Sequence, residues 1–219
     1  MKKGFTLLEM SIVVVIIGFI FAIITTGQKL VNNAKNNRLI MDLGEVVDYY
    51  NIFKVAYDDP PGDYENANFQ FGGTNGNGNG FVDGSEDDHF FTHMELADIA
   101  PDYGYTNEYK FPSRPDSILV AASNGSSTSN RMPTSTNYLV AYGQSDSSSG
   151  WLVRTTDAYK IDKKLDDGRA TAGKIAGFDA GTGNYSGSDT NCIDGDAYNV
   201  GNTENGGCTL IINIDQLKF

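Results

Sequence analysis

The chain opens with an apolar run that is long enough to cross a membrane. The run extends from Phe5 to Ile24, and Glu9 is the only charged residue within it. About 20 helical residues at 1.5 Å each match the ~30 Å hydrocarbon core of a bilayer. The pattern therefore predicts a transmembrane helix over residues 5–25. A secretory signal peptide is the alternative, but it needs a longer charged region and a small-residue cleavage site after the apolar stretch, which Thr25 to Gln28 supply poorly.

The next thirty or so residues predict that this helix continues as an amphipathic stalk. Apolar residues recur there at helical spacing among Lys, Asn, Asp and Glu. Pro60 and Pro61 end the pattern, because proline lacks an amide donor and disfavours the helical conformation of its predecessor. One long helix is therefore expected over residues 5–58. The apolar positions of the stalk are Val31, Ala34, Leu39, Ile40, Leu43, Val46, Val47, Tyr50, Phe53 and Val55.

Beyond residue 58 the pattern changes to short β-prone runs separated by segments rich in Asn, Ser, Gly and Asp. We expect an α+β fold, in which an antiparallel sheet in a head domain (residues 59–219) packs on the second half of the long helix. The expected strands are 117–122, 138–142, 151–155 and 209–214, and the expected short helices are 89–97 and 159–165. Residues 123–130, 145–150 and 181–189 are low in apolar content and predict flexible loops.

Composition narrows the class of function. Hydrophobic residues make up 40% of the chain, enough for a packed core, while the formal net charge of -12 opposes non-specific binding to nucleic acid or anionic lipid. The two cysteines, Cys192 and Cys208, suit one disulfide in an oxidising compartment better than a metal site.

The first residues carry a family resemblance. An acid inside an apolar span is costly and marks function by default, and here Glu9 stands in the sequence Gly4-Phe5-Thr6-Leu7-Leu8-Glu9. This sequence resembles the prepilin peptidase recognition motif of type IV pilins and type II secretion pseudopilins. The resemblance implies that residues 1–4 are a leader cut off after Gly4, that the new Phe5 amine is methylated, and that Glu9 neutralises this amine on a neighbouring subunit. Snorkelling of Glu9 to the membrane surface is the alternative.

The same resemblance implies a structural role. The chain is expected to be a subunit of a type IV pilus or pilus-like filament, assembled through its N-terminal helix, with a type II secretion pseudopilin or a minor pilin acting in adhesion as alternatives. The implied partners are other pilin subunits, the prepilin peptidase, an inner-membrane assembly platform and the membrane before assembly. Lys2 and Lys3 would keep the leader cytoplasmic, with the head outside an inner membrane and later in an extracellular or periplasmic filament. Residues 59–101 and 161–168 also resemble segments of a subgroup of pilin-like proteins.

No enzyme is expected. The sequence contains no nucleophile elbow, phosphate-cradling loop or nucleotide fingerprint, and it has two histidines. Hydrolysis by a pair of carboxylates is the remaining catalytic alternative, because acidic residues are plentiful.

Residues 75–86 match the register of an EF-hand calcium loop. Gly80 stands at the sharp turn, Val82 at the apolar anchor, and Asp87 or Asp88 could replace the closing acid. A plain glycine-asparagine surface loop is the alternative, because these residues favour turns for conformational reasons alone. Calcium is the one cofactor that the sequence suggests. The six ligand positions are Asn75, Asn77, Asn79, Phe81, Asp83 and Glu86.

Two further groups of residues have side chains that could bind a metal. His89 and His93 lie four residues apart on an expected helix, a spacing that zinc can use, but without a third ligand a surface or interface pair is the preferred interpretation. An acidic patch is interpreted as solvated charge beside Lys160, Lys163 and Lys164, with a second calcium site as the alternative. The patch consists of Asp157, Asp162, Asp166 and Asp167.

Overall fold

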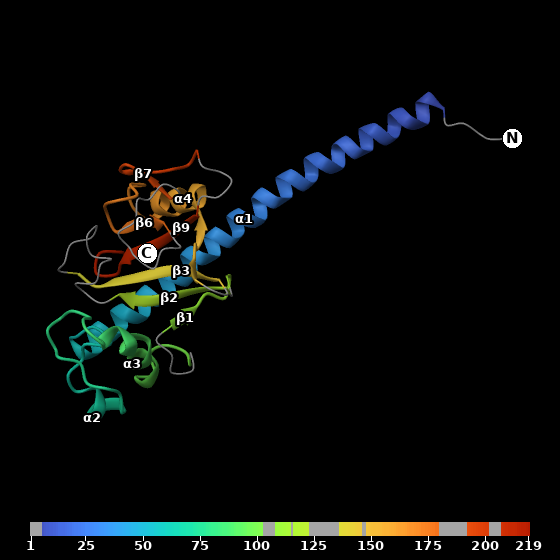
Figure 1. The fold of residues 1–219 in the computed structure, drawn as a ribbon. Helices are drawn as coiled ribbons and strands as arrows, with labels where there is room; N and C mark the ends of the chain where they lie inside the picture. Colours follow the sequence, from blue (N-terminus) through green and yellow to red (C-terminus); the bar gives the residue numbers. More distant parts are fainter. Residues whose placement is uncertain are drawn as a thin grey trace. The chain divides into compact units, whose positions relative to one another are not determined.

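The computed structural model describes residues 6–102, 108–114, 116–122, 136–145, 148–179, 192–201 and 207–219 (Figure 1). The chain divides into two compact units, Met1–Arg38 and Leu39–Phe219. The boundary falls inside the first helix, so the second unit contains part of that helix together with the residues expected to form the head.

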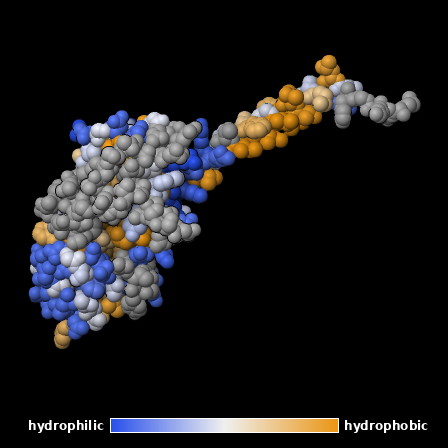
Figure 2. All heavy atoms as spheres, viewed as in Figure 1, coloured by the Kyte–Doolittle hydropathy of each residue, from blue (hydrophilic) through white to orange (hydrophobic). Residues whose placement is uncertain are grey.

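The first helix, α1, spans Leu7–Tyr57, close to the predicted range. Its end is marked by Asp58, which adopts a left-handed conformation with φ 64° two residues before the paired prolines. In the first unit the large apolar side chains of α1 are exposed, and Figure 2 shows them in orange along the helix. Phe19, for example, is 67% exposed and Ile23 is 70% exposed. By length and composition the helix is suited to cross a membrane, which is the structural form that the apolar run predicts.

In the second unit one face of α1 is buried, as the amphipathic pattern predicts. Leu39, Leu43, Tyr50 and Phe53 are fully buried in a core shared with strand residues such as Leu119 and Leu210. Full burial of one such side chain stabilises the folded state by about 1.5–3 kcal/mol. The buried face of α1 therefore contributes strongly to the packing of the helix on the sheet. Val55, counted among the stalk positions, is instead 87% exposed.

The sheet is antiparallel throughout and has seven strands in the described part of the chain. Its main order is β1-β2-β3-β9-β5, with β4 beside β3 and β6 beside β9. Strand β9 is the centre of the sheet, since it pairs with β3, β5 and β6. The bounds are β1 Glu108–Lys110, β2 Ser117–Ala122, β3 Tyr138–Ser145, β4 Ser148–Gly150, β5 Val153–Arg154, β6 Ile175–Asp179 and β9 Gly207–Asn213. A separate pair is formed by β7 Ile193–Asp194 and β8 Ala197–Tyr198.

The observed sheet confirms the predicted α+β fold class and corrects several ranges. The loop expected at 145–150 is wrong, because Ser148–Gly150 forms β4 and pairs with the end of β3. The strand expected at 151–155 is reduced to Val153–Arg154, since Thr155 already begins a helix. The loops expected at 123–130 and 181–189 lie outside the described residues.

Four short helical segments accompany the sheet in the described residues. They are α2 Ala67–Phe71, the 3₁₀ helix η1 Glu86–His89, α3 Phe90–Leu96 and α4 Thr155–Leu165. The range expected for α3 is nearly right, whereas α4 begins four residues before the expected start. Helix α4 contacts β5, β6, β8 and β9, and so sits where the C-terminal segments meet.

A disulfide joins Cys192 and Cys208, as predicted, with an S–S distance of 2.04 Å. Both sulfur-bearing side chains are fully buried. The bond ties the start of β7 to the central strand β9, and closing a loop of this size stabilises a fold by about 3 kcal/mol in the chain-entropy account.

Candidate functional site

Glu9 lies in the first turn of α1, where it forms a reciprocal pair with Thr6. The Thr6 amide and the Thr6 hydroxyl both donate to Glu9 Oε2, at 2.7 and 2.9 Å, and the Glu9 amide donates to Thr6 Oγ1 at 3.3 Å. This is a capping box, which satisfies amide groups that lack partners at a helix start. No described residue donates to the second oxygen, Oε1. Glu9 thus has a role in the helix start and retains an oxygen for another donor.

Thr6 was not predicted as the partner of Glu9. The signal was present, because Thr6-Leu7-Leu8-Glu9 has the Thr-x-x-Glu spacing of a capping box. The two residues expected at the cleavage point, Gly4 and Phe5, lie outside the described residues, and their roles stay predictions.

The glycine-asparagine loop, residues 75–86, is organised around two buried carboxylates. Glu86 accepts the amide of Asn77 on Oε1 at 2.8 Å and the amide of Asp83 on Oε2 at 3.0 Å. Asp63 accepts the amides of Asn79 and Gly80 at 3.1 and 2.6 Å. Burial raises the pKa of Glu86, while the two backbone hydrogen bonds lower it. Asp63 was not predicted to hold the loop, because it precedes the loop by more than ten residues and lies outside the register of the calcium motif.

The remaining expected calcium ligands are only partly brought together. The side-chain amides of Asn77 and Asn79 both donate to the Asp83 carboxylate, at 3.1 and 2.8 Å. Asn75 instead accepts the amide of Asn68, at 2.7 Å, at the start of α2. Phe81 donates its amide to Asn79 Oδ1 at 2.8 Å. The flanks are α2 and the short η1 helix rather than a pair of long helices.

Calcium binding by this loop stays a prediction, and the geometry decides which variant tests it. Asp83→Asn removes one anionic ligand but leaves the two amides that Glu86 holds, whereas a change at Glu86 would also undo the loop. We expect a dissociation constant of roughly 10⁻⁴ to 10⁻³ M, because asparagines occupy the early positions. Binding should stabilise the wild-type head by about 1.4 kcal/mol at tenfold excess over that constant, and Asp83→Asn should remove most of this gain.

The measurement is calorimetry and thermal melting of a fragment that begins at Lys29, with calcium and then with a chelator. Asp194→Asn is the matched control, since Asp194 is exposed and lies outside the loop. Identical melting curves with and without calcium in the wild type would leave the plain glycine-asparagine loop as the correct interpretation.

The interpretation of His89 and His93 as a surface or interface pair is wrong for His93, which is fully buried. Its Nδ1 accepts the Gly62 amide at 2.9 Å, and its Nε2 lies 2.7 Å from the Thr74 carbonyl oxygen, to which it can donate. The neutral ring therefore joins the turn after α1 to the start of the glycine-asparagine loop. Burial lowers the pKa of His93 to about 4. His89 stacks on this ring at a centroid distance of 6.2 Å.

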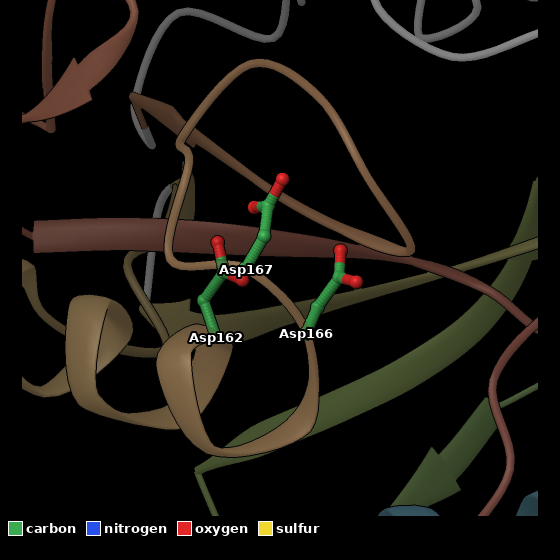
Figure 3. Close-up of side chains that lie close together, drawn as sticks. All are labelled: Asp162, Asp166 and Asp167. Carbon is green, nitrogen blue, oxygen red and sulfur yellow. The ribbon is translucent and has the colours of Figure 1, made fainter.

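The acidic patch around α4 also differs from its prediction as solvated charge. Asp162 is fully buried, and oxygen atoms of Asp162, Asp166 and Asp167 lie within 4.8 Å of one another (Figure 3). Asp162 accepts the Tyr198 hydroxyl at 2.8 Å and the Gly168 amide at 3.0 Å. The pKa of Asp162 is raised to about 7, chiefly by burial and in smaller part by the two neighbouring carboxylates, although the hydrogen bonds from Tyr198 and Gly168 lower it.

The other three aspartates of the patch, Asp157, Asp166 and Asp167, each contact a nearby backbone amide or lysine. Asp157 pairs with Lys160 at 3.1 Å. Asp166 accepts the amide of Lys174, and Asp167 accepts the amide of Arg169 at 2.8 Å. Each carboxylate thus fixes the backbone or a neighbouring cation around the end of α4.

A polar network anchors the glycine-asparagine loop to α1. Asn137 accepts the Val82 amide at 2.8 Å and donates to the Gly80 carbonyl at 3.3 Å, and its own amide donates to Asp215 at 2.8 Å. The other Asp215 oxygen accepts from Tyr50 and Lys54 of α1, at 2.5 and 3.0 Å. These partners are far apart in the sequence, so no local pattern could have predicted the network.

Comparison with known proteins identifies the start of the chain. Residues 1–25 match the family described as the prokaryotic N-terminal methylation motif. No curated protein and no solved structure is found to match.

Proposed function

Since its residues 1–25 carry the prepilin signature of type IV pilins and pseudopilins, we propose that this chain is a structural subunit of a type IV pilus or pilus-like filament. In this role the leader is cut after Gly4 by the prepilin peptidase, and the mature chain assembles with other pilin subunits through α1. The proposed work of the protein is mechanical rather than catalytic.

The methylation motif is the observation that carries this proposal, and the form of α1 supports it. The motif implies processing by a prepilin peptidase, and the apolar helix that follows suits membrane anchoring before assembly. The exposed apolar side chains of the first unit require either lipid or protein around them. Lipid surrounds the helix before assembly, and neighbouring helices do so afterwards. In the proposed topology the head lies outside the inner membrane and the assembly platform delivers it to the filament.

Glu9 is the proposed partner of the methylated Phe5 amine of a neighbouring subunit. Its Oε1 is the oxygen that the capping box leaves for that contact, since both bonds from Thr6 end on Oε2. An ammonium group in an apolar filament core is costly unless an anion neutralises it.

Mass spectrometry of the protein from sheared cell-surface or periplasmic filaments tests the processing step. The expected chain begins with methylated Phe5. Assembled filaments whose subunits retain Met1–Gly4 would overturn the proposal.

Glu9→Gln is expected to leave cleavage intact and to lower incorporation into filaments at least about tenfold. Glutamine can replace glutamate in a capping box, so this variant removes the charge and keeps the helix start. Removal of one partner of a desolvated charge pair costs more than the ~1.4 kcal/mol that a tenfold change requires. The measurement is the ratio of processed chain in filaments to processed chain in the membrane.

Thr6→Ala is the matched control for this variant, because it removes the cap and keeps the charge. We expect it to incorporate far better than Glu9→Gln. Equal incorporation of Glu9→Gln and the wild type would show that Glu9 serves the helix start alone.

A further inference from the structure

Three asparagines of the glycine-asparagine loop, Asn75, Asn77 and Asn79, are each followed directly by glycine. Asparagine is chemically labile, and it deamidates most readily before glycine, which has no side chain to keep its amide nitrogen away from the asparagine side chain. All three asparagines are exposed, so water reaches them. The chemical lifetime of the loop therefore depends on how the folded head restrains these three Asn-Gly pairs.

The amide of the glycine in each pair is the group that would attack, and the three amides have different acceptors. The Gly76 amide donates to the Tyr64 carbonyl at 3.0 Å. The Gly78 amide donates to the Asp63 carbonyl at 2.9 Å. The Gly80 amide donates instead to a side-chain oxygen, Asp63 Oδ2, at 2.6 Å. Of the three pairs, the last one alone thus depends on a side chain, which a substitution can remove without a change to the main chain.

The side chain of Asn79 is restrained at both ends. Its Oδ1 accepts the Phe81 amide at 2.8 Å, and its Nδ2 donates to Asp83 Oδ2 at 2.8 Å. The main-chain amide of Asn79 donates to the other oxygen of Asp63, at 3.1 Å. Asp63 is fully buried, and its negative charge disfavours removal of the Gly80 amide proton, which must leave before the nitrogen can attack. The reaction at Asn79 therefore has to wait until the loop opens at Asp63.

From these contacts we propose that Asn79 is a latent deamidation site and that Asp63 controls its reactivity. In the reaction the Gly80 nitrogen forms a bond to Asn79 Cγ, the bond from Cγ to Nδ2 breaks, and Nδ2 leaves as ammonia that has gained the proton of the Gly80 amide. Water then opens the cyclic imide at either carbonyl carbon and gives aspartate or isoaspartate. The proposal goes beyond the filament function and does not depend on it.

Deamidation of Asn79 changes both the charge and the main chain of the loop. Each product carries a new carboxylate beside Asp83, and isoaspartate also adds a methylene group to the main chain before Gly80. The Gly80 amide and carbonyl, which contact Asp63 and Asn137, are displaced by that extra group. Modification at this one residue should therefore release the loop from the network that anchors it to α1.

Peptide mass spectrometry of the full-length chain in detergent micelles tests the proposal. The chain is incubated in mildly alkaline buffer, with and without enough urea to unfold the head, and the deamidation rate of each asparagine is measured. In the wild type we expect Asn79 to react at least about tenfold more slowly without urea than with it, because the loop must open before the nitrogen can attack.

Two variants of Asp63 separate its side chain from the rest of the fold. Asp63→Ala should raise the native rate at Asn79 at least about tenfold and should change the rates at Asn75 and Asn77 much less. Asp63→Asn retains an oxygen that can accept from the Gly80 amide, so it should give an intermediate rate. Glu65→Ala is the matched control, because it removes an exposed carboxylate two residues away, and it should leave all three rates close to those of the wild type.

The other outcomes contradict the proposal in distinct ways. A wild-type rate at Asn79 that is as high without urea as with it would show that the folded loop gives no protection. Slower reaction at Asn79 in both Asp63 variants would show that the carboxylate promotes the reaction as a base. Equal acceleration at Asn75, Asn77 and Asn79 in both variants would show that Asp63 holds the loop as a whole, which overturns its assignment to the Asn79–Gly80 pair.

Discussion

Replacement of Gly76 by alanine is expected to destabilise the head by about 3 kcal/mol, at the upper end of the cost of overpacking. A Cβ at this position would lie 2.2–2.4 Å from the backbone of Asp63. The neighbour is backbone rather than the flexible end of a side chain, so the two segments would have to separate. For a head of this size the expected fall in melting temperature is about 10 °C.

The surroundings of Gly76 explain why the segments cannot separate cheaply. Its amide donates to the Tyr64 carbonyl at 3.0 Å, and the Gly78 amide donates to the Asp63 carbonyl at 2.9 Å. The Asp63 carboxylate holds the loop further along, through Asn79 and Gly80. A shift of Asp63 away from an alanine side chain would lengthen these bonds together.

Gly84→Ala is the matched control, because it separates conformational strain from lack of space. Gly84 has φ +60° and open space around a side chain, so alanine there incurs only the cost of a left-handed conformation, about 1 kcal/mol. Urea unfolding followed by the fluorescence of Trp151, the single tryptophan, measures both variants. A loss for Gly76→Ala no larger than that for Gly84→Ala would contradict the close approach.

Local patterns in the sequence predicted the helix α1, the strand range of β2, the disulfide and the fold class. Each depends on a signal within a short window: the helical spacing from Leu39 to Phe53, the β-prone run at 117–122, or an isolated pair of cysteines. Because paired prolines end a helix, Pro60 and Pro61 also predicted the end of α1 to within one residue. The methylation motif is likewise local, which is why the start of the chain was the most informative part of the sequence.

Burial of charged and polar side chains could not be predicted in this way. Asp162 stands beside Lys163 and Lys164 in the sequence, and His93 was paired with His89, so both were assigned to the surface. Their partners Gly62, Thr74 and Tyr198 come from other segments, so only the tertiary fold shows that their polar atoms are satisfied away from water. For the same reason the roles of Asp63 and Asn137 could not be predicted, since their contacts with the glycine-asparagine loop join residues that are 16 or more positions apart.

These two buried groups have opposite effects on the pH dependence of stability. The pKa of His93 is about 4 in the folded protein against an ordinary value of 6.5, because burial disfavours the charged ring. Between these values the unfolded chain binds more protons than the folded protein at this residue, so the stability it contributes is present above pH 6.5 and is lost as pH falls toward 4.

The stability that Asp162 contributes changes with pH in the opposite direction. Its pKa is about 7 in the folded protein against an ordinary value of 3.8, chiefly because of burial. Here the folded protein binds more protons, so the stability it contributes is present below pH 3.8 and is lost as pH rises toward 7. The groups that face it are Tyr198, which lowers its pKa, and Asp166 and Asp167, which raise it. The two titrations therefore oppose each other between about pH 4.5 and 6.5 in the wild type.

Replacement of either residue alone should reveal how the other changes the free energy of unfolding with pH. We expect the stability of Asp162→Asn relative to the wild type to rise by about 2 kcal/mol from pH 4.5 to 6.5, and that of His93→Gln to fall by a similar amount, since a group that titrates only in one state contributes up to about 1.4 kcal/mol per pH unit. Asparagine retains an oxygen to accept from Tyr198, and glutamine can both accept from Gly62 and donate to Thr74.

Urea unfolding at four pH values across this interval measures the differences in stability. The exposed Asp194→Asn is the control, and its difference from the wild type is expected to stay constant with pH. A flat difference for Asp162→Asn would show that this carboxyl group is ionised in the folded head throughout the interval, and a flat difference for His93→Gln would show that the buried ring accepts a proton without loss of its contacts.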